Sequence, residues 1–385
     1  MATVYLHIGL PKTGTTALQH FLYNNDKALK EHDICFPDFG LRYPGVGARK
    51  NGRFLIVSGK DANGNPDYSV PAAEYRPTLD KIADLSKTYG RIFLTDEGIW
   101  NISRKRSDFW PKLKADLADR GLDLKIIIYL RRQDSFIESL YAQKIKETKN
   151  SYTFFEFLES EHVSNWPLDY ASGLDVLSAV VGKENLIIRL YEKTQYQGAE
   201  HTLFSDFLDI FGLSLSDGFT VKKELYHPSL SGTYLELKRL LNVLPKNVKN
   251  CPAIQGSISS IQKASPFTNE REKHSFFPPG GARAFLGKYK ESNERVAREY
   301  LGREDGVLFC EPVAELPEEH ISTEEMLRDM IIVYGRSIQI LETENSELQK
   351  RLDKLEDELE KAKMSHSASL ENRAKKVIKR MIGKK

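Results

Sequence analysis

Cysteine is scarce in this chain of 385 residues: only Cys35, Cys251 and Cys310 occur, far apart and odd in number. So few cysteines exclude a disulfide-rich secreted fold, and their spacing excludes a zinc finger, so we expect free thiols in a reducing compartment. No stretch approaches the ~18 apolar residues that a membrane span requires, and no signal peptide pattern opens the sequence. We therefore expect a cytoplasmic protein.

A strong excess of one charge is also missing. Lys plus Arg number 56 and Asp plus Glu number 54, a net charge of +2, which does not suit a protein whose whole surface binds nucleic acid. Hydrophobic residues make up 40% and charged residues 29%, so disordered and collagen-like classes are excluded. At roughly 150 residues per domain, the length indicates two or three structural units.

Four short apolar runs, each followed by a helix-compatible stretch, indicate alternating strands and helices. The runs are residues 3–8, 91–94, 125–130 and 186–190. Continuous apolar runs suit strands buried on both faces, so we predict an α/β fold of the P-loop type with a central parallel sheet between two helical layers.

Residues 222–303 have a different character, because six prolines punctuate them. We predict an α-rich elaboration here, with helices over residues 232–241 and 282–300.

The sharpest local signal is GLPKTGTT at residues 9–16, between the first strand and the first helix. Such a loop points backbone N–H groups at an anion, and the helix that follows adds its positive N-terminal end. It differs from a Walker A loop, because Thr15 follows Gly14 where a nucleotide-hydrolysing loop has its lysine, and the lysine is Lys12 instead. This shift disfavours a P-loop kinase acting on a small molecule, which stays the alternative function.

Two segments resemble sulfotransferases, enzymes that use 3′-phosphoadenosine 5′-phosphosulfate (PAPS). HIGLPKTGTTALQHFL at residues 7–22 is similar to their 5′-phosphosulfate loop, and YLRRQDSFIESLY at residues 129–141 is similar to their 3′-phosphate site. The resemblance implies that Lys12 contacts the bridging oxygen of the phosphosulfate. It also implies that Arg131 and Ser139, eight residues apart, hold the 3′-phosphate, with Arg132 as the alternative ligand. The implied PAPS-binding residues are Pro11, Lys12, Thr13, Gly14, Thr15, Thr16, Arg131 and Ser139.

The resemblance is weaker further along. Residues 185–213 and 289–309 are similar to the end of the core and the carboxy-terminal piece of bacterial carbohydrate sulfotransferases. This implies a carbohydrate or glycolipid acceptor. The family's glycine-rich nucleotide-binding segment is absent, since Gly280, Gly281 and Arg283 look more like the start of a helix. We expect no metal requirement.

Sulfuryl transfer also requires a base for the acceptor hydroxyl. Residues 91–94 are followed by Asp96 and Glu97 at the edge of the predicted sheet, and the family uses a glutamate or a histidine. We prefer Glu97, with Asp96 second, and expect the two carboxylates to raise each other's pKa. Of the histidines, His7 is expected to be a packing residue and His20 a surface residue, and His227 is a distant third candidate for the base.

A seven-residue apolar repeat begins at Ile331 and runs through residue 364, with Asn345 at one a position. This pattern is typical of a coiled coil, and we expect a homodimer; an amphipathic helix folded back on the domain is the alternative.

The last 21 residues, 365–385, form a basic amphipathic tail. Seven of their bases lie from Arg373 onward, which favours peripheral contact with an anionic inner membrane face, testable by pelleting with vesicles. The predicted domains are thus 1–330, 331–364 and 365–385.

Overall fold

The computed structural model describes the chain except residues 61–62, 64–65, 104–105, 148–149, 165, 223–231, 246–250, 255–256, 259–274, 314–322 and 383–385. The chain forms two compact units. The first unit contains residues 1–144, 152–229 and 273–319, and the second contains 145–151, 230–272 and 320–385.

The first unit is built on a five-stranded parallel sheet in the order β2-β5-β1-β6-β7. Four of its strands are the predicted ones: β1 (Ala2–His7), β5 (Arg91–Thr95), β6 (Leu122–Leu130) and β7 (Leu186–Leu190). The fifth, β2 (Ile34–Cys35), pairs with β5 at the edge and was not predicted. After β1 the chain moves to one side of the sheet and later crosses to the other, so β1 lies where the strand order reverses.

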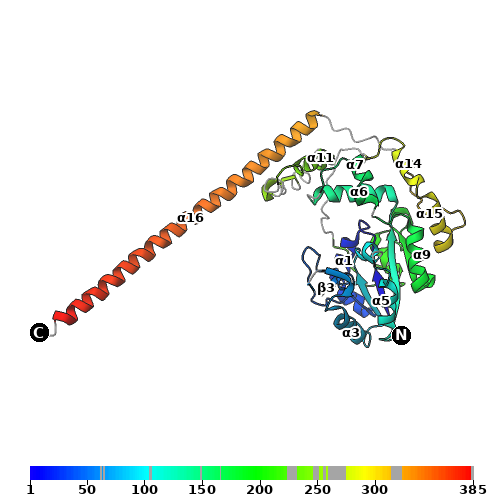
Figure 1. Ribbon diagram of the computed structural model, residues 1–385, viewed down its shortest axis with the longest axis horizontal. Helices are drawn as coiled ribbons and strands as arrows, with labels where there is room; N and C mark the ends of the chain where they lie inside the picture. The colour runs from blue at the N-terminus through cyan, green and yellow to red at the C-terminus, as the bar shows by residue number, and fades with distance from the viewer. Residues whose placement is uncertain are drawn as a thin grey trace. The chain divides into compact units, whose positions relative to one another are not determined.

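Helices cover both faces of this sheet, so the predicted three-layer α/β arrangement is confirmed. On one face lie α1 (Thr15–Asn24), α2 (Asp26–Glu31) and α10 (Leu203–Asp209). On the other lie α5 (Phe109–Ala118) and α9 (Tyr170–Val181); Figure 1 labels α1, α5 and α9. Further helices of this unit are α3 (Tyr75–Leu85), α4 (Ile99–Ile102), α7 (Phe154–Glu159), α8 (Glu161–Ser164), α14 (Gly281–Gly287) and α15 (Lys290–Arg295). Helix α6 (Gln133–Lys146) follows β6, and a two-stranded antiparallel hairpin joins β3 (Ser58–Lys60) to β4 (Pro66–Pro71).

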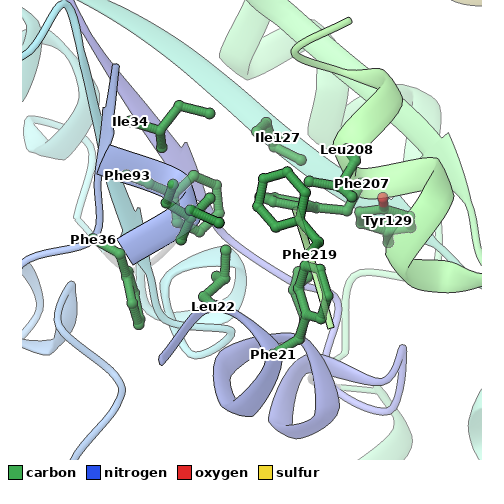
Figure 2. Packing of buried hydrophobic residues seen from close by; sticks show 13 residues of the cluster. Phe21, Leu22, Ile34, Phe36, Phe93, Ile127, Tyr129, Phe207, Leu208 and Phe219 are labelled. Carbon is green, nitrogen blue, oxygen red and sulfur yellow. The ribbon is translucent and has the colours of Figure 1, made fainter. Parts of the chain in front are cut away.

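Aromatic rings fill the core between the sheet and the α1 and α10 layer. Phe21 and Leu22 of α1 meet Phe207 of α10 over Phe93 and Tyr129 of the sheet (Figure 2). The Phe93 and Phe207 rings pack edge to face, with their centroids 5.1 Å apart. This packing fixes the start of α1, and therefore the loop before it, against the carboxyl end of β1.

The predicted helix over residues 282–300 is wrong as one element. The chain forms α14, a break at residues 288–289, and then α15, which continues without interruption into a π-helical turn, η6 (Val296–Tyr300). Glycine has the poorest helix propensity after proline, so Gly287 accounts for the break. Gly280 caps α14 with φ +74°, so Gly280 and Gly281 start a helix, as predicted.

The second unit contains α11 (Gly232–Leu241), a predicted helix, and α16 (Thr323–Ile382), a single helix of 60 residues. Helix α16 packs on α11 near its start, where Asp329, Val333 and Ser337 are at most 3% exposed. The residues of α16 include the segment predicted as a coiled coil and most of the basic tail. Dimerisation, membrane contact and the predicted domain limits stay predictions.

Among the helices in the described ranges, none combines the length and the apolar composition needed to cross a membrane.

Candidate functional site

The loop after β1 is fastened to the neighbouring strand β6. The Leu10 N–H donates to the Tyr129 carbonyl at 3.0 Å, and the Tyr129 N–H donates to the Gly9 carbonyl at 2.8 Å. Within the loop, the Thr13 hydroxyl donates to the Leu10 carbonyl at 2.5 Å. Lys12 adopts φ +67°, a left-handed conformation that is uncommon for a residue with a side chain. The loop is therefore a fixed turn.

Gly14 ends the loop and begins α1. It has φ +73°, and a Cβ atom there would lie 2.5 Å from the Leu203 side chain and 3.3 Å from the Tyr191 ring. The first N–H groups of a helix have no partner within the helix, and Gly14 has no side chain that could cap them. Of the two threonines that follow, Thr15 is buried and Thr16 is exposed. This arrangement suits an anion at the start of α1.

Arg131, at the end of β6, reaches this loop. Its Nη1 donates to the Lys12 carbonyl at 2.5 Å, and its guanidinium lies 5.4 Å from the centre of the Tyr191 ring. Burial lowers the pKa of Arg131, and no carboxylate lies within ion-pair distance of it in the described part of the chain. The two segments expected to bind phosphate thus meet, and no carboxylate of the described residues pairs with the cation between them.

The partner of Arg131 on α6 is Ser135, which the sequence analysis missed. The Ser135 hydroxyl accepts hydrogen bonds from Nε at 3.0 Å and from Nη2 at 2.7 Å. Ser139 lies one helical turn further along α6, on the same face as Ser135, and is half-buried. An arginine followed four residues later by serine could have signalled this contact.

Arg132 has a different environment. It pairs with Asp134 at 2.9 Å and donates to the Glu311 carbonyl at 2.6 Å. Since these groups already occupy its guanidinium, the geometry favours Arg131 over Arg132 as an anion ligand.

Glu97 lies beside the loop. Its backbone oxygen is 3.2 Å from where a Cβ of Gly9 would be, and its carboxylate accepts from Gln19 of α1 at 3.4 Å and pairs with Lys50. Burial raises the pKa of Glu97, but the Lys50 ammonium more than offsets this, so the pKa is lowered. The expectation that the two carboxylates raise each other's pKa is therefore wrong for Glu97, whose pKa Lys50 lowers, and holds for Asp96, to whose raised pKa Glu97 contributes.

Asp96 points elsewhere and is completely buried. One oxygen lies 2.7 Å from Nε of Arg53, and the other accepts from the Gly98 N–H at 2.7 Å. Burial raises the pKa of Asp96 to about 6, with the charge of Glu97 a smaller contribution than the opposing charge of Arg53. Asp96 is therefore less accessible to an acceptor than Glu97, whose side chain is 14% exposed.

Lys50 and Arg53 were missed by the sequence analysis. Their segment is held to the sheet by Asn51, whose side chain donates to the Phe93 carbonyl at 3.1 Å and accepts from the Thr95 N–H at 2.8 Å. Lys50 and Arg53 are separated only by Asn51 and Gly52, in a segment with no periodic pattern. Their approach to the carboxylates therefore becomes visible only in the folded chain.

The histidines behave largely as predicted. His7 is buried, and its Nδ1 lies 2.9 Å from the Thr95 hydroxyl. His20 is half-buried rather than a surface residue, and its Nε2 lies 3.1 Å from Nη1 of Arg49. His227 lies outside the described residues.

The described residues include no group of three or more His, Cys, Asp or Glu side chains that could hold a metal ion. The three cysteines are free thiols.

Comparison with known proteins gives few matches. No protein-family model matches the chain. An uncharacterized protein of Archaeoglobus fulgidus is 27% identical over 230 residues, which are 57% of this chain and 58% of that protein. The matched region thus spans little more than half of that relative.

Among solved structures, a sulfotransferase from Alicyclobacillus acidocaldarius is similar, with a TM-score of 0.38 and 15% identity over 63% of this chain and 94% of that one. Values this low carry no argument about function, which rests on the site itself.

The buried His7 generates a pH prediction. Burial lowers its pKa from 6.5 to about 4, so the unfolded chain takes up a proton that the folded chain does not. The contribution of the neutral His7 side chain to the free energy of unfolding is complete above pH 6.5. It decreases by about 3 kcal/mol as the pH falls to about 4. In His7→Asn, the free energy of unfolding should fall less steeply across this range, measured by urea denaturation at several pH values. Equal slopes in the two proteins would contradict the assignment.

Proposed function

We propose that this chain transfers a sulfuryl group from PAPS to a hydroxyl of a carbohydrate or glycolipid. The observation that carries the proposal is the 2.5 Å hydrogen bond from Arg131 to the Lys12 carbonyl. It joins the anion loop after β1 to a second cation after β6. A donor with phosphate groups at two positions on one ribose needs two adjoining anion sites of this kind.

The electrostatics of the two sites support an anionic ligand. Burying a guanidinium without a carboxylate is costly, and a bound phosphate offsets this cost with hydrogen bonds to the charged group. Arg131 is a half-buried guanidinium of this kind among the described residues, and the uncapped start of α1 lies across Gly14 and Tyr191 from it. Arg131, Ser135 and Ser139 are the residues that would hold the 3′-phosphate.

The displaced loop lysine favours sulfuryl over phosphoryl transfer. In the proposed reaction the bond from sulfur to the bridging oxygen breaks and a bond from sulfur to the acceptor oxygen forms. The electron pair stays on the bridging oxygen, where Lys12 stabilises the growing charge. The acceptor proton passes to a base, and 3′-phosphoadenosine 5′-phosphate leaves. The proposal includes a cytoplasmic reaction that needs no metal ion.

Glu97 is the base in this proposal. It is partly accessible, adjoins Gly9 of the loop, and is held ionised by Lys50, so it can accept a proton near neutral pH. Asp96 is completely buried against Arg53, which supports the preference for Glu97.

A groove along the sheet edge supports an extended polar acceptor. One cavity of about 880 Å³ and a second of about 180 Å³ share Tyr23, Phe36, Pro37 and Asp38. The second ends at Arg49 and Asn51, the residues on either side of Lys50, which holds Glu97.

The lining of this groove is aromatic and nearly neutral. Lys30 pairs with Asp26 at 2.7 Å and Arg42 pairs with Asp38 at 2.8 Å, so most lining charges are already matched. Tyr23 is 56% exposed, and the Arg49 guanidinium lies 4.5 Å from the centre of its ring, so a sugar can stack on the face opposite Arg49. By contrast, Trp100 and Trp110 are buried and cannot. Matched charge and exposed aromatic faces favour a neutral carbohydrate over a polyanion.

The nucleotide sites are tested by calorimetric titration with 3′-phosphoadenosine 5′-phosphate and, separately, with ATP. We expect the former to bind tightly and ATP weakly. Arg131→Ala should weaken binding by roughly 10- to 100-fold, because it removes hydrogen bonds to a charged phosphate. Arg132→Ala, the neighbouring control, should change it by less than about threefold. Tight binding of ATP alone would favour the kinase alternative, and equal effects of the two arginines would remove Arg131 from the site.

The base is tested by Glu97→Gln, which keeps the size and hydrogen bonding of the side chain. Turnover should fall by ~100-fold or more with nucleotide affinity unchanged, because the amide cannot take the acceptor proton. Asp96→Asn serves as the comparison and should lower turnover less than Glu97→Gln does. A larger loss in Asp96→Asn would identify Asp96 as the base. Turnover of ³⁵S-labelled PAPS measures both, and near-normal turnover of Glu97→Gln would exclude Glu97.

The groove is tested with a panel of neutral hexasaccharides as acceptors. Tyr23→Ala should raise the acceptor KM by about tenfold, through loss of one stacking surface, without changing nucleotide affinity. Tyr152→Ala, an exposed tyrosine outside the groove, should leave KM unchanged. Sulfation of a hexasaccharide with the same KM in both variants would place the acceptor elsewhere.

A further inference from the structure

Helix α16 exposes a regular apolar stripe. From Ile338 to Leu359, the apolar side chains at the a and d heptad positions are 47–61% exposed. They are Ile338, Leu341, Leu348, Leu352, Leu355 and Leu359. The helix packs on its own unit through a different face, that of Asp329, Val333 and Ser337. Within the described residues of the second unit, the stripe is left uncovered. An exposed stripe of this kind marks a contact with a partner.

We propose that the partner is a second copy of this chain, and that the two helices pair in parallel and in register. The first argument is Asn345, a polar residue at an a position amid leucines. In a parallel, in-register pair the two Asn345 side chains meet and can hydrogen bond to each other. In an antiparallel pair or a shifted register, each faces an apolar side chain and loses that bond.

The second argument is the pattern of flanking charges. In a parallel, in-register coiled coil, a g residue of one helix faces the e residue of the next heptad in its partner. This places Arg351 opposite Glu356 and Glu358 opposite Lys363, and each contact occurs twice by symmetry. The one other pair in this stretch is Glu344 with Gln349, because Ser337 at the preceding g position is buried in its own unit, so no like charges meet.

The flanking charges are available for these contacts. Arg351, Glu356 and Lys363 are exposed and form no ion pair within the part of α16 that the structure describes. Glu358 has a Lys354 partner in its own helix at 3.8 Å, both well exposed, a contact weak enough to be exchanged. The same stretch of α16 thus provides an exposed row of apolar side chains, a polar Asn345 that can fix the register, and flanking charges of opposite sign.

The first experiment is sedimentation equilibrium of the full chain at micromolar concentration. We expect twice the mass of one chain. The mass of a single chain, or of three or more, would overturn the proposal.

The second experiment tests orientation and register with two full-length variants. One carries Arg351→Glu with Lys363→Glu, and the other carries Glu356→Lys with Glu358→Lys. Each alone places like charges at all four contacts, and its dimer dissociation constant should rise by roughly 100-fold. An equimolar mixture restores four opposite-charge contacts, so it should form a heterodimer as tight as the natural dimer.

Circular dichroism of each variant separates loss of pairing from loss of the helix, because the variants alone should keep the helix of the monomer. A variant that dimerises as well as the natural chain, or a mixture that stays monomeric while both variants are helical, would overturn the parallel register. Asn345→Leu provides an independent check, since it should admit species larger than a dimer. The proposal does not depend on the chemistry of the first unit, because every measurement is of mass and helicity.

Discussion

The hydrogen bond from the Arg131 guanidinium to the Lys12 carbonyl is the contact on which the site depends. It links the ends of two adjacent parallel strands, β1 and β6, and holds the intervening loop in one conformation. The backbone bonds between Leu10, Gly9 and Tyr129 reinforce this link. Arg131 donates one hydrogen bond to a neutral carbonyl and two to a hydroxyl. No carboxylate in the described part of the chain pairs with its positive charge.

On the other side of the loop the charges are paired, since each of the two acidic residues after β5 has a cation beside it. Glu97 has Lys50 and Asp96 has Arg53, yet burial leaves the pKa of Asp96 at about 6 while that of Glu97 is lowered. Two adjacent carboxylates thus have pKa values shifted in opposite directions, and the more deeply buried one has the raised pKa. Within the described residues, the candidate site thus combines a cation without a carboxylate partner and a partly exposed carboxylate paired with a lysine.

The sequence allowed the strands, the loop and Arg131 to be predicted, because these depend on continuous apolar runs and on short spacings. It did not reveal β2, whose two residues are too few for a pattern, or the break after Gly287 and the π-helical turn at Val296–Tyr300. Lys50 and Arg53 come from an irregular segment, and their approach to Asp96 and Glu97 is a tertiary contact. The pKa of Glu97 could not be inferred without Lys50.

Glycine 9 and Gly14 bracket the loop, and each admits a neighbour where a side chain would stand. At Gly9 the neighbour is the backbone of Glu97, and at Gly14 it is Leu203 of α10. Both residues also have positive φ, so even alanine would strain the backbone. A side chain at Gly9 would push the loop away from the segment that carries Glu97, and one at Gly14 would push it away from α10, so both glycines hold the loop in place without contributing a charged or polar side chain.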